Sequence, residues 1–198
     1  MYGVKRERIL RILLNHMDQP LSKYRVSKLS EVSISWTIEY LKTLEERGFI
    51  KGTKVRRPGA LLEYWASIAR RPLHYEFFHD SPTKLLRTIK MEYALTTYLA
   101  ENLLNRYLFP TRTDIYILKA DISKWKDRIT RRGHFGKGNL RLLVADEHVF
   151  YKKRKVKSLW VASIPQVLVD LKMEGGPCEE AYDMMVSKYV LGRRDRNF

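Results

Sequence analysis

Residues 20–51 read PLSKYRVSKLSEVSISWTIEYLKTLEERGFIK, and this stretch decides the expected fold. Two serines, Ser22 and Ser33, each precede a run of apolar residues at helical spacing, and serine is a favoured residue at helix N-termini. A proline before the first run and a glycine after the second are typical of helix boundaries. The stretch therefore predicts a helix over residues 22–29, a tight turn, and a second helix over residues 34–47.

Each predicted helix has an apolar face and a face left for a partner. The expected inward residues are Tyr24, Val26 and Leu29 on the first helix and Ile34, Ile38, Leu41 and Leu44 on the second. The outward residues at the start and middle of the second helix are then Ser33, Ser35, Trp36, Thr37 and Tyr40. Trp36 and Tyr40 are four residues apart and share a face, so they either contact a partner or pack on a neighbouring helix.

The flanking segments complete a recognisable order of elements. Apolar spacing predicts a helix over residues 5–17, and a basic turn over residues 51–59 is followed by a mixed apolar segment, residues 61–68, that we expect to return as a strand. Helix, helix, tight turn, helix and β-hairpin is the order of a winged helix-turn-helix domain. In such a domain the third helix enters the major groove of DNA.

This stretch also resembles a known family. Residues 20–50 resemble the helix-turn-helix core of prokaryotic winged-helix regulators, and LEERGFIK, residues 44–51, is similar to their passage from recognition helix into wing. Five later segments resemble the C-terminal domain of the AbiEi-type antitoxins of type IV toxin–antitoxin systems. They are YALTTYLAENLL at 93–104, DIYI at 114–117, NLRLL at 139–143, VASIPQVLVDL at 161–171 and GGPCEEA at 175–181.

The resemblance implies a function. It implies a DNA-binding repressor of its own operon, with a toxin of nucleotidyltransferase type as partner, and it supplies no catalytic residues to assign in this sequence. We therefore expect a sequence-specific double-stranded DNA-binding protein that acts as a transcriptional regulator. Because one winged helix rarely supplies enough specificity, we also expect a homodimer or two sites on each duplex.

Charge supports a polyanionic partner. The 198 residues include 38 Lys and Arg against 22 Asp and Glu, a net charge of +16. Such a basic excess is typical of nucleic-acid-binding proteins. No apolar run approaches the roughly 18 residues of a membrane span, and none follows a basic N-terminus as in a signal peptide, so we expect a soluble, cytoplasmic protein without a membrane partner.

Three groups of cations are the expected phosphate contacts. For any single lysine, however, a solvated side chain is the alternative. The groups are Lys23, Arg25 and Lys28 on the first helix of the motif, Lys51, Lys54, Arg56 and Arg57 in the wing, and a second patch on a later hairpin or loop, Lys152, Lys153, Arg154, Lys155 and Lys157. Such contacts supply affinity but little sequence information.

The charged break Arg70-Arg71-Pro72 predicts a domain boundary. We expect a winged-helix domain over residues 1–72 and a small mixed α/β domain over residues 73–198, an α+β protein overall. The second domain is expected to contain helices at 82–89, 91–107, 123–130, 163–173 and 178–190, strands at 113–118, 140–145 and 148–152, an extended segment at 74–80 and a glycine-rich turn at 133–138.

Alternatives from other functional classes remain open. Asp170-Leu-Lys172, with Asp146 or Asp114 as a second carboxylate, has the spacing of a metal-dependent nuclease. An RNA-binding or protein-assembly module is a further interpretation. The single cysteine, Cys178, excludes an intramolecular disulfide, and the scattered histidines form no metal-binding pair, so we expect no metal. The glycine pattern at residues 133–138 matches no nucleotide-binding motif, and we expect no cofactor and no enzyme activity.

Overall fold

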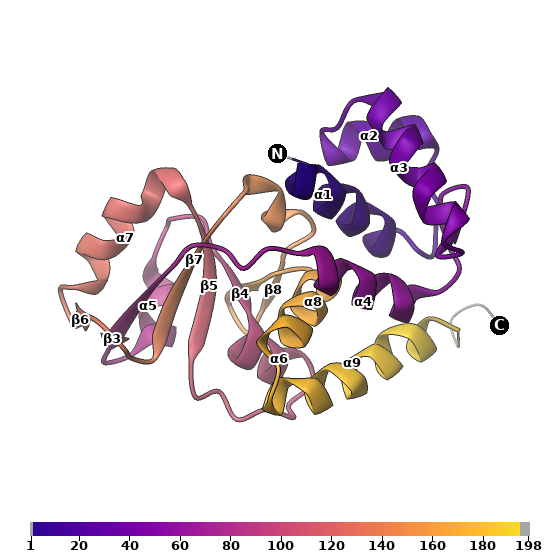
Figure 1. Ribbon diagram of the computed structural model, residues 1–198. Helices are drawn as coiled ribbons and strands as arrows, with labels where there is room; N and C mark the ends of the chain where they lie inside the picture. The colour runs from indigo at the N-terminus through magenta and orange to yellow at the C-terminus, as the bar shows by residue number, and fades with distance from the viewer. Residues whose placement is uncertain (1, 195–198) are drawn as a thin grey trace. The chain divides into compact units, whose positions relative to one another are not determined.

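A computed structural model describes residues 2–194, and the chain forms two compact units (Figure 1). The first unit is Met1–Arg70 with Tyr182–Phe198, and the second is Arg71–Ala181. The sequence analysis assigned everything beyond residue 72 to one domain, whereas the chain from Tyr182 onward belongs with the first unit. The Tyr189 hydroxyl donates a hydrogen bond to the Leu14 carbonyl at 2.6 Å, which ties the last helix to the first.

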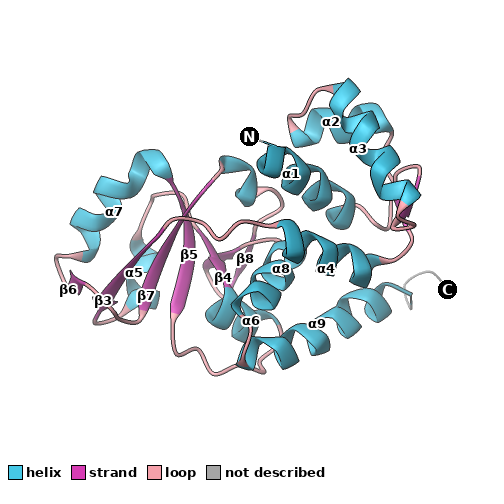
Figure 2. Cartoon of the chain, viewed as in Figure 1, coloured by secondary structure: helices cyan, strands magenta, loops and turns pink. Residues whose placement is uncertain are grey.

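Three helices begin the first unit, close to the predicted ranges. They are α1 (Tyr2–Asn15), α2 (Lys23–Ser30) and α3 (Ile34–Glu46) (Figure 2). Ser22 caps α2 as predicted, because its hydroxyl accepts a hydrogen bond from the Arg25 N–H at 3.2 Å. The turn between α2 and α3 passes through Glu31, whose φ is 55°.

The segment after α3 differs from the prediction. The hairpin is only β1 (Ile50–Lys51) and β2 (Lys54–Val55), joined by a two-residue turn in which Gly52 has a φ of 63°. The strand predicted over residues 61–68 is wrong, since these residues lie in α4 (Pro58–Ile68). Leu61, Leu62 and Trp65 are fully buried at helical spacing, and a proline in the first helical turn is a normal helix start.

A seven-stranded mixed sheet organises the second unit, in the order β6-β3-β7-β5-β4-β9-β8. The central strands β5 (Thr113–Leu118) and β7 (Leu140–Ala145) run parallel, with Ile115 opposite Leu142. The remaining strands are β3 (His74–His79), β4 (Ala94–Thr96), β6 (Gly133–Phe135), β8 (Arg154–Val156) and β9 (Leu159–Val161). The α+β class is therefore confirmed.

The helices of the second unit lie between these strands in sequence. They are α5 (Pro82–Thr88), α6 (Thr97–Leu104), α7 (Ile122–Ile129) and α8 (Ile164–Glu174), with the short 3-10 turns η1 (Lys119–Asp121) and η2 (Glu147–Phe150); α9 (Pro177–Arg194) begins in this unit. Helices α6 and α8 pack on each other and on β4. In the described part of the chain no helix has the length and apolar character needed to cross a membrane.

Three predicted elements of this unit are wrong. The helix expected over residues 91–107 begins as strand β4 and becomes helical only at Thr97, whose φ of 48° turns the chain between the two. The strand expected over residues 148–152 is the 3-10 turn η2. The glycine-rich turn starts as edge strand β6, which pairs with β3. Glycine is needed at positions 133 and 138, because a Cβ atom there would lie 2.2 and 2.4 Å from backbone oxygens of β3.

A buried ionic network joins three elements of the second unit. Asp114 on β5 is fully buried and lies between Arg112 and Arg141, with closest N–O distances of 2.7 and 2.9 Å. Both guanidinium groups also contact Glu174 at the end of α8, at 2.6 and 2.8 Å. Burial opposes ionisation of Glu174, but the hydrogen bonds from Arg141 and Arg112 outweigh it and lower the pKa of this carboxyl. These two arginines are therefore used inside the fold.

Candidate nucleic-acid interface

Helix α2 presents its cations to solvent. Lys23, Arg25 and Lys28 are all exposed, as the phosphate-contact prediction requires. The ammonium of Lys28 lies 5.5 Å from the ring centre of Tyr24, and Tyr24 is 62% exposed rather than inward as predicted. This helix therefore combines positive charge with an exposed aromatic ring.

Helix α3 is rotated relative to the predicted face. Thr37 and Tyr40, expected to face a partner, are buried at 0% and 5% exposure, while Ile34 and Ile38, expected in the core, are 38% and 40% exposed. The predicted buried stripe was residues 34, 38, 41 and 44, and the observed one is residues 37, 40, 41 and 44. Both sets have helical periodicity, so the buried face of α3 is the face next to the predicted one. Thr37 and Tyr40 are therefore not available to a partner.

Three predicted contact residues remain at the start of α3. Ser33 and Ser35 are exposed, and Trp36 is half-buried. The Trp36 ring packs on Tyr40 with 5.3 Å between ring centres. The ammonium of Lys5, on α1, lies 5.9 Å from the Trp36 ring centre. Tyr40 and Lys5 thus cover part of the Trp36 ring, and the rest of the ring remains accessible to a partner.

The β1–β2 hairpin is fastened at its turn. The Gly52 N–H donates to a Glu45 carboxylate oxygen at 2.8 Å, and the Thr53 hydroxyl donates to the Leu21 carbonyl at 2.6 Å. On either side of this turn, Lys51 and Lys54 are exposed and lie directly opposite each other in the strand register. The hairpin therefore holds two like charges side by side at a fixed position.

Arg56 and Arg57 lie at the base of the hairpin rather than at its tip. Both backbone N–H groups donate to the Phe49 carbonyl, at 2.9 and 3.2 Å. The two side chains are exposed and border a shallow hollow with Val186 and Val190 of α9. Their place in the fold therefore differs from that of Lys51 and Lys54, although all four belong to the predicted wing.

The second basic patch lies on the β8–β9 hairpin, as predicted. Lys152, Arg154, Lys155 and Lys157 are exposed. Lys153 is instead half-buried, pairs with the Glu92 carboxylate, and lies 4.4 Å from the ring centre of Trp160. One of the five predicted cations is therefore used within the fold.

The carboxylates of the nuclease alternative have partners within the fold, and Asp114 is paired with Arg112 and Arg141. Asp170 is 8% exposed, and its carboxylate accepts hydrogen bonds from Tyr116 at 2.7 Å and Gln166 at 2.9 Å. Asp146 caps η2 by accepting from the His148 N–H, while Lys172 is exposed on α8. Among the residues that the structure describes, no three His, Cys, Asp or Glu side chains are grouped so as to hold a metal ion.

Cys178 is fully buried, and burial raises the pKa of its thiol to about 11. Because the thiolate is the nucleophilic form, this position favours a packing role. The packed interpretation of the cysteine therefore fits its environment.

Sequence reasoning missed two features of this surface. Ile34 and Ile38 form an exposed apolar pair one turn apart, and Lys5 and Arg6 of α1 lie over the aromatic rings of α3. The exposed isoleucine pair could have been found from the sequence, because α3 has more apolar residues at helical spacing than one buried face can hold. No local pattern indicates the second, because α1 and α3 meet only in the folded chain.

Comparison with known proteins adds no relative. No family model, curated protein or solved structure matches this chain. Function must therefore be argued from the surfaces described above.

Proposed function

We propose that this protein binds double-stranded DNA through its first unit, in the manner of a winged helix, with α3 in the major groove and the β1–β2 hairpin on the sugar-phosphate backbone. The observation that carries the proposal is the pair Lys51 and Lys54. The two exposed lysines face each other across the hairpin, and neither makes an ion pair with a carboxylate in the described part of the chain.

Like charges directly opposite on two strands destabilise a hairpin. A hairpin of two-residue strands has little pairing energy to offset that repulsion. Backbone phosphates of DNA would remove the repulsion and release counterions at the same time. Positive charge on α2, at Lys23, Arg25 and Lys28, extends the surface available to a polyanion.

The exposed start of α3 has the chemistry needed to read bases. The hydroxyls of Ser33 and Ser35 are able to exchange hydrogen bonds with base edges or phosphates, and the methyl groups of Ile34 and Ile38 suit the thymine methyl. Helix N-terminal residues are the ones that reach base edges in helix-turn-helix complexes. We therefore assign sequence preference to these four residues rather than to Thr37 and Tyr40.

The resemblance to AbiEi-type antitoxins supports a regulatory role. On that basis we propose a transcriptional repressor that acts on its own operon, as a homodimer or with two sites on each duplex. The second unit would then provide the dimer contact, the contact with a nucleotidyltransferase-type toxin, or a further DNA contact through the β8–β9 hairpin.

Fluorescence anisotropy across a salt series tests this proposal. The ligands are duplex DNA from the region upstream of the protein's own gene, a scrambled duplex and single-stranded RNA. We expect the upstream duplex to bind on the order of 10³-fold more tightly than the scrambled one. Lys51→Gln with Lys54→Gln should weaken both duplexes roughly tenfold or more and lower the salt slope by about two.

A charge-matched control keeps the test specific. Lys119 and Lys137 are exposed in the second unit, and changing both to Gln removes the same net charge. An unchanged salt slope in the hairpin variant, or an equal change in this control, would remove the hairpin from the interface. Absence of duplex binding near physiological salt would overturn the DNA-binding proposal itself.

A protein-interaction module is the second candidate, and one observation favours it. Tyr24, Ile34 and Ile38 are 62%, 38% and 40% exposed on the α2 and α3 helices, a concentration of apolar surface that also suits a protein partner. If Ile34→Ser with Ile38→Ser leaves DNA binding unchanged but abolishes self-association in sedimentation, this candidate replaces base reading by α3.

A further inference from the structure

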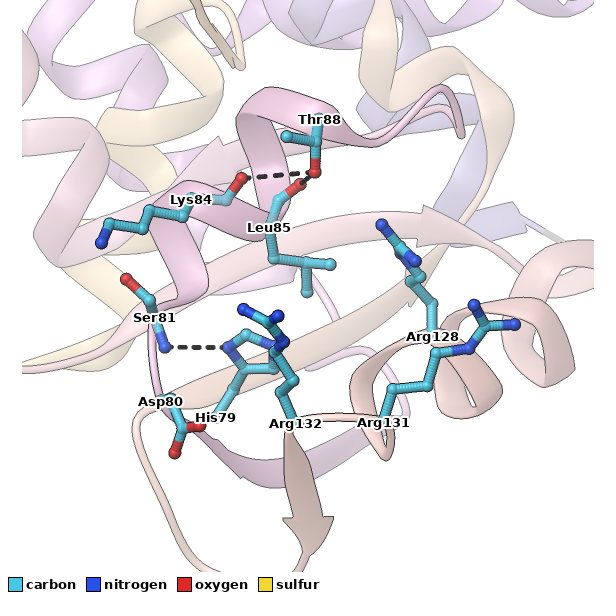
Figure 3. A pocket seen from close by; sticks show the side chains of 9 residues that line it. All are labelled: His79, Asp80, Ser81, Lys84, Leu85, Thr88, Arg128, Arg131 and Arg132. Carbon is cyan, nitrogen blue, oxygen red and sulfur yellow. Dashed lines mark hydrogen bonds between the residues drawn. The ribbon is translucent and has the colours of Figure 1, made fainter.

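The second unit contains a cationic cavity of about 400 Å³ that the DNA-binding proposal does not use (Figure 3). It lies between α5 and the end of α7, beside the last residue of β3. Its principal lining residues are His79, Lys84, Leu85, Arg128, Arg131 and Arg132. A cavity of this volume is within the usual range for small-molecule sites, about 300–1,000 Å³.

The floor of the cavity is buried and held in place. His79 and Leu85 are 4% and 7% exposed. The His79 backbone exchanges two hydrogen bonds with the Asn139 amide, both at 3.0 Å, and the Ser81 N–H donates to His79 Nδ1 at 3.0 Å. Nδ1 is therefore an acceptor, and Nε2 is left as the donor of a neutral imidazole.

Burial also lowers the pKa of His79, which keeps the imidazole neutral at physiological pH, and the nearby Arg132 acts in the same direction while Asp80 opposes both. A neutral imidazole can donate one hydrogen bond without adding charge. The floor thus offers one polar donor beside the apolar side chain of Leu85.

The rim of the cavity carries an excess of positive charge. Arg128, Arg131 and Arg132 come from one short segment at the end of α7, and Lys84 comes from α5. Asp80 is the single carboxylate in the lining, against four cations. None of the three arginines makes an ion pair with a carboxylate among residues 2–194, in contrast to the half-buried Arg112 and Arg141.

The segment that carries the arginines is anchored to the floor. The Asp80 N–H donates to the Arg132 carbonyl at 3.2 Å, and His79 lies opposite Gly133 in the β3–β6 register. The arginine side chains thus start from a fixed position next to the buried histidine. Figure 3 shows the side chains of Leu85 from α5 and Arg128 from α7 on facing sides of the hollow.

We propose that this cavity binds a phosphorylated small molecule of mononucleotide size, with its phosphates on the arginines and its uncharged part against Leu85 and Thr88. Guanidinium groups match phosphate geometry through paired N–H donors, and several of them favour a ligand with two or more phosphate charges. A duplex suits the site less well, because its phosphates lie on a convex surface that does not reach a floor formed by buried His79 and Leu85.

Isothermal titration calorimetry at physiological ionic strength, without magnesium, tests the proposal. The probes are ADP, inorganic pyrophosphate and adenosine. We expect ADP and pyrophosphate to bind with one-to-one stoichiometry, ADP more tightly, and adenosine to show no saturable binding. Arg128→Gln with Arg132→Gln should weaken ADP at least about tenfold, the loss expected for two charge-assisted hydrogen bonds.

Two further variants separate a site from general charge attraction. Arg87→Gln with Lys90→Gln removes the same charge from exposed residues of the second unit that do not line the cavity, and should leave ADP binding unchanged. Thr88→Trp keeps every charge but fills the cavity from an exposed position, and should abolish ADP binding. Thermal unfolding of each variant shows whether it remains folded.

The outcomes that overturn the proposal are distinct from failure of the DNA-binding proposal. The proposal is rejected if neither ADP nor pyrophosphate shows saturable binding. It is also rejected if Arg87→Gln with Lys90→Gln weakens ADP binding as much as Arg128→Gln with Arg132→Gln does. If both probes fail while Arg128→Gln with Arg132→Gln weakens duplex DNA binding, the arginines are a nucleic-acid contact and the cavity is not a ligand site.

Discussion

The arginines of the buried network and the lysines of the β1–β2 hairpin carry the same charge but differ in what surrounds them. Arg112 and Arg141 share Asp114 and Glu174 inside the second unit. Lys51 and Lys54 face each other in the first unit with solvent around them. A net charge of +16 therefore does not measure the charge available to a partner, because part of the positive charge is neutralised within the fold.

The largest expected effect on stability comes from removing Asp114 from its ion pairs with Arg112 and Arg141. Asp114→Asn removes the fully buried carboxylate and leaves two guanidinium groups with only the half-buried Glu174, so we expect a loss of about 3–5 kcal/mol in the free energy of unfolding. Urea unfolding measures it. The matched control is Asp121→Asn, which removes an exposed pair with Lys124 and should cost less than about 1 kcal/mol. Similar losses in the two variants would erase the distinction between paired and exposed cations.

Buried and exposed side chains can also be compared within α3. Tyr40→Ala removes a ring that is 5% exposed, and should lower the free energy of unfolding by about 3 kcal/mol. Ile38→Ala, two residues away at 40% exposure, should cost less than about 1 kcal/mol but change preference among DNA sequences. Denaturation and anisotropy on two duplexes separate these effects. A reversed pattern would restore the outward position predicted for Tyr40.

The network should also make stability depend on pH. The pKa of Glu174 is lowered in the folded protein, so folding is favoured while this carboxyl is ionised, above its ordinary unfolded value. The contribution is lost as pH falls through the lowered folded pKa, in the acid range below that ordinary value. We expect thermal unfolding temperatures of the wild type to decrease there, and those of Glu174→Gln to depend less steeply on pH. Parallel curves for the two proteins would show that other groups cause the decrease.

The smallest effect is expected at the second basic hairpin. Lys155→Gln with Lys157→Gln should weaken duplex binding less than about threefold, compared with roughly tenfold or more for the Lys51 and Lys54 pair, because Trp160 already engages Lys155 at 5.6 Å from its ring centre. Anisotropy over the same salt series compares them directly. An equal decrease in salt slope would make the β8–β9 hairpin a full part of the DNA interface.

Much of the local structure was predictable from short-range signals. Ser22 and Ser33 precede helices, the helix predicted over residues 82–89 is α5, and the apolar runs at 113–118 and 140–145 are the two central parallel strands. Each signal depends on hydrogen bonds or alternation within a few residues. The segment at 61–68 was assigned as a strand although Pro58 and the spacing of Leu61, Leu62 and Trp65 indicate a helix.

The candidate contact residues were predicted only in part. The exposed cations of α2 lie on a helix whose ends the sequence analysis located. Lys51 and Lys54 are also exposed, but they lie on two short strands rather than in the single turn predicted over residues 51–59. The buried positions of Thr37 and Tyr40 could not be predicted in the same way. Two overlapping stripes satisfy helical periodicity in α3, and the choice between them depends on what α1 and α2 pack against.

Composition and near neighbours were enough to predict the α+β class, the Ser22 cap, most helix boundaries and the excess of positive charge. Ser33 was also expected to cap a helix, but it precedes α3 without a side-chain cap hydrogen bond. Which cations are neutralised depends on contacts that form only in the folded chain. Asp114 meets Arg141 across 27 residues and Glu174 meets Arg112 across 62, while Arg128, Arg131 and Arg132 meet no carboxylate of the described chain. Charge pairing acts through space, so residue spacing along the chain does not reveal it.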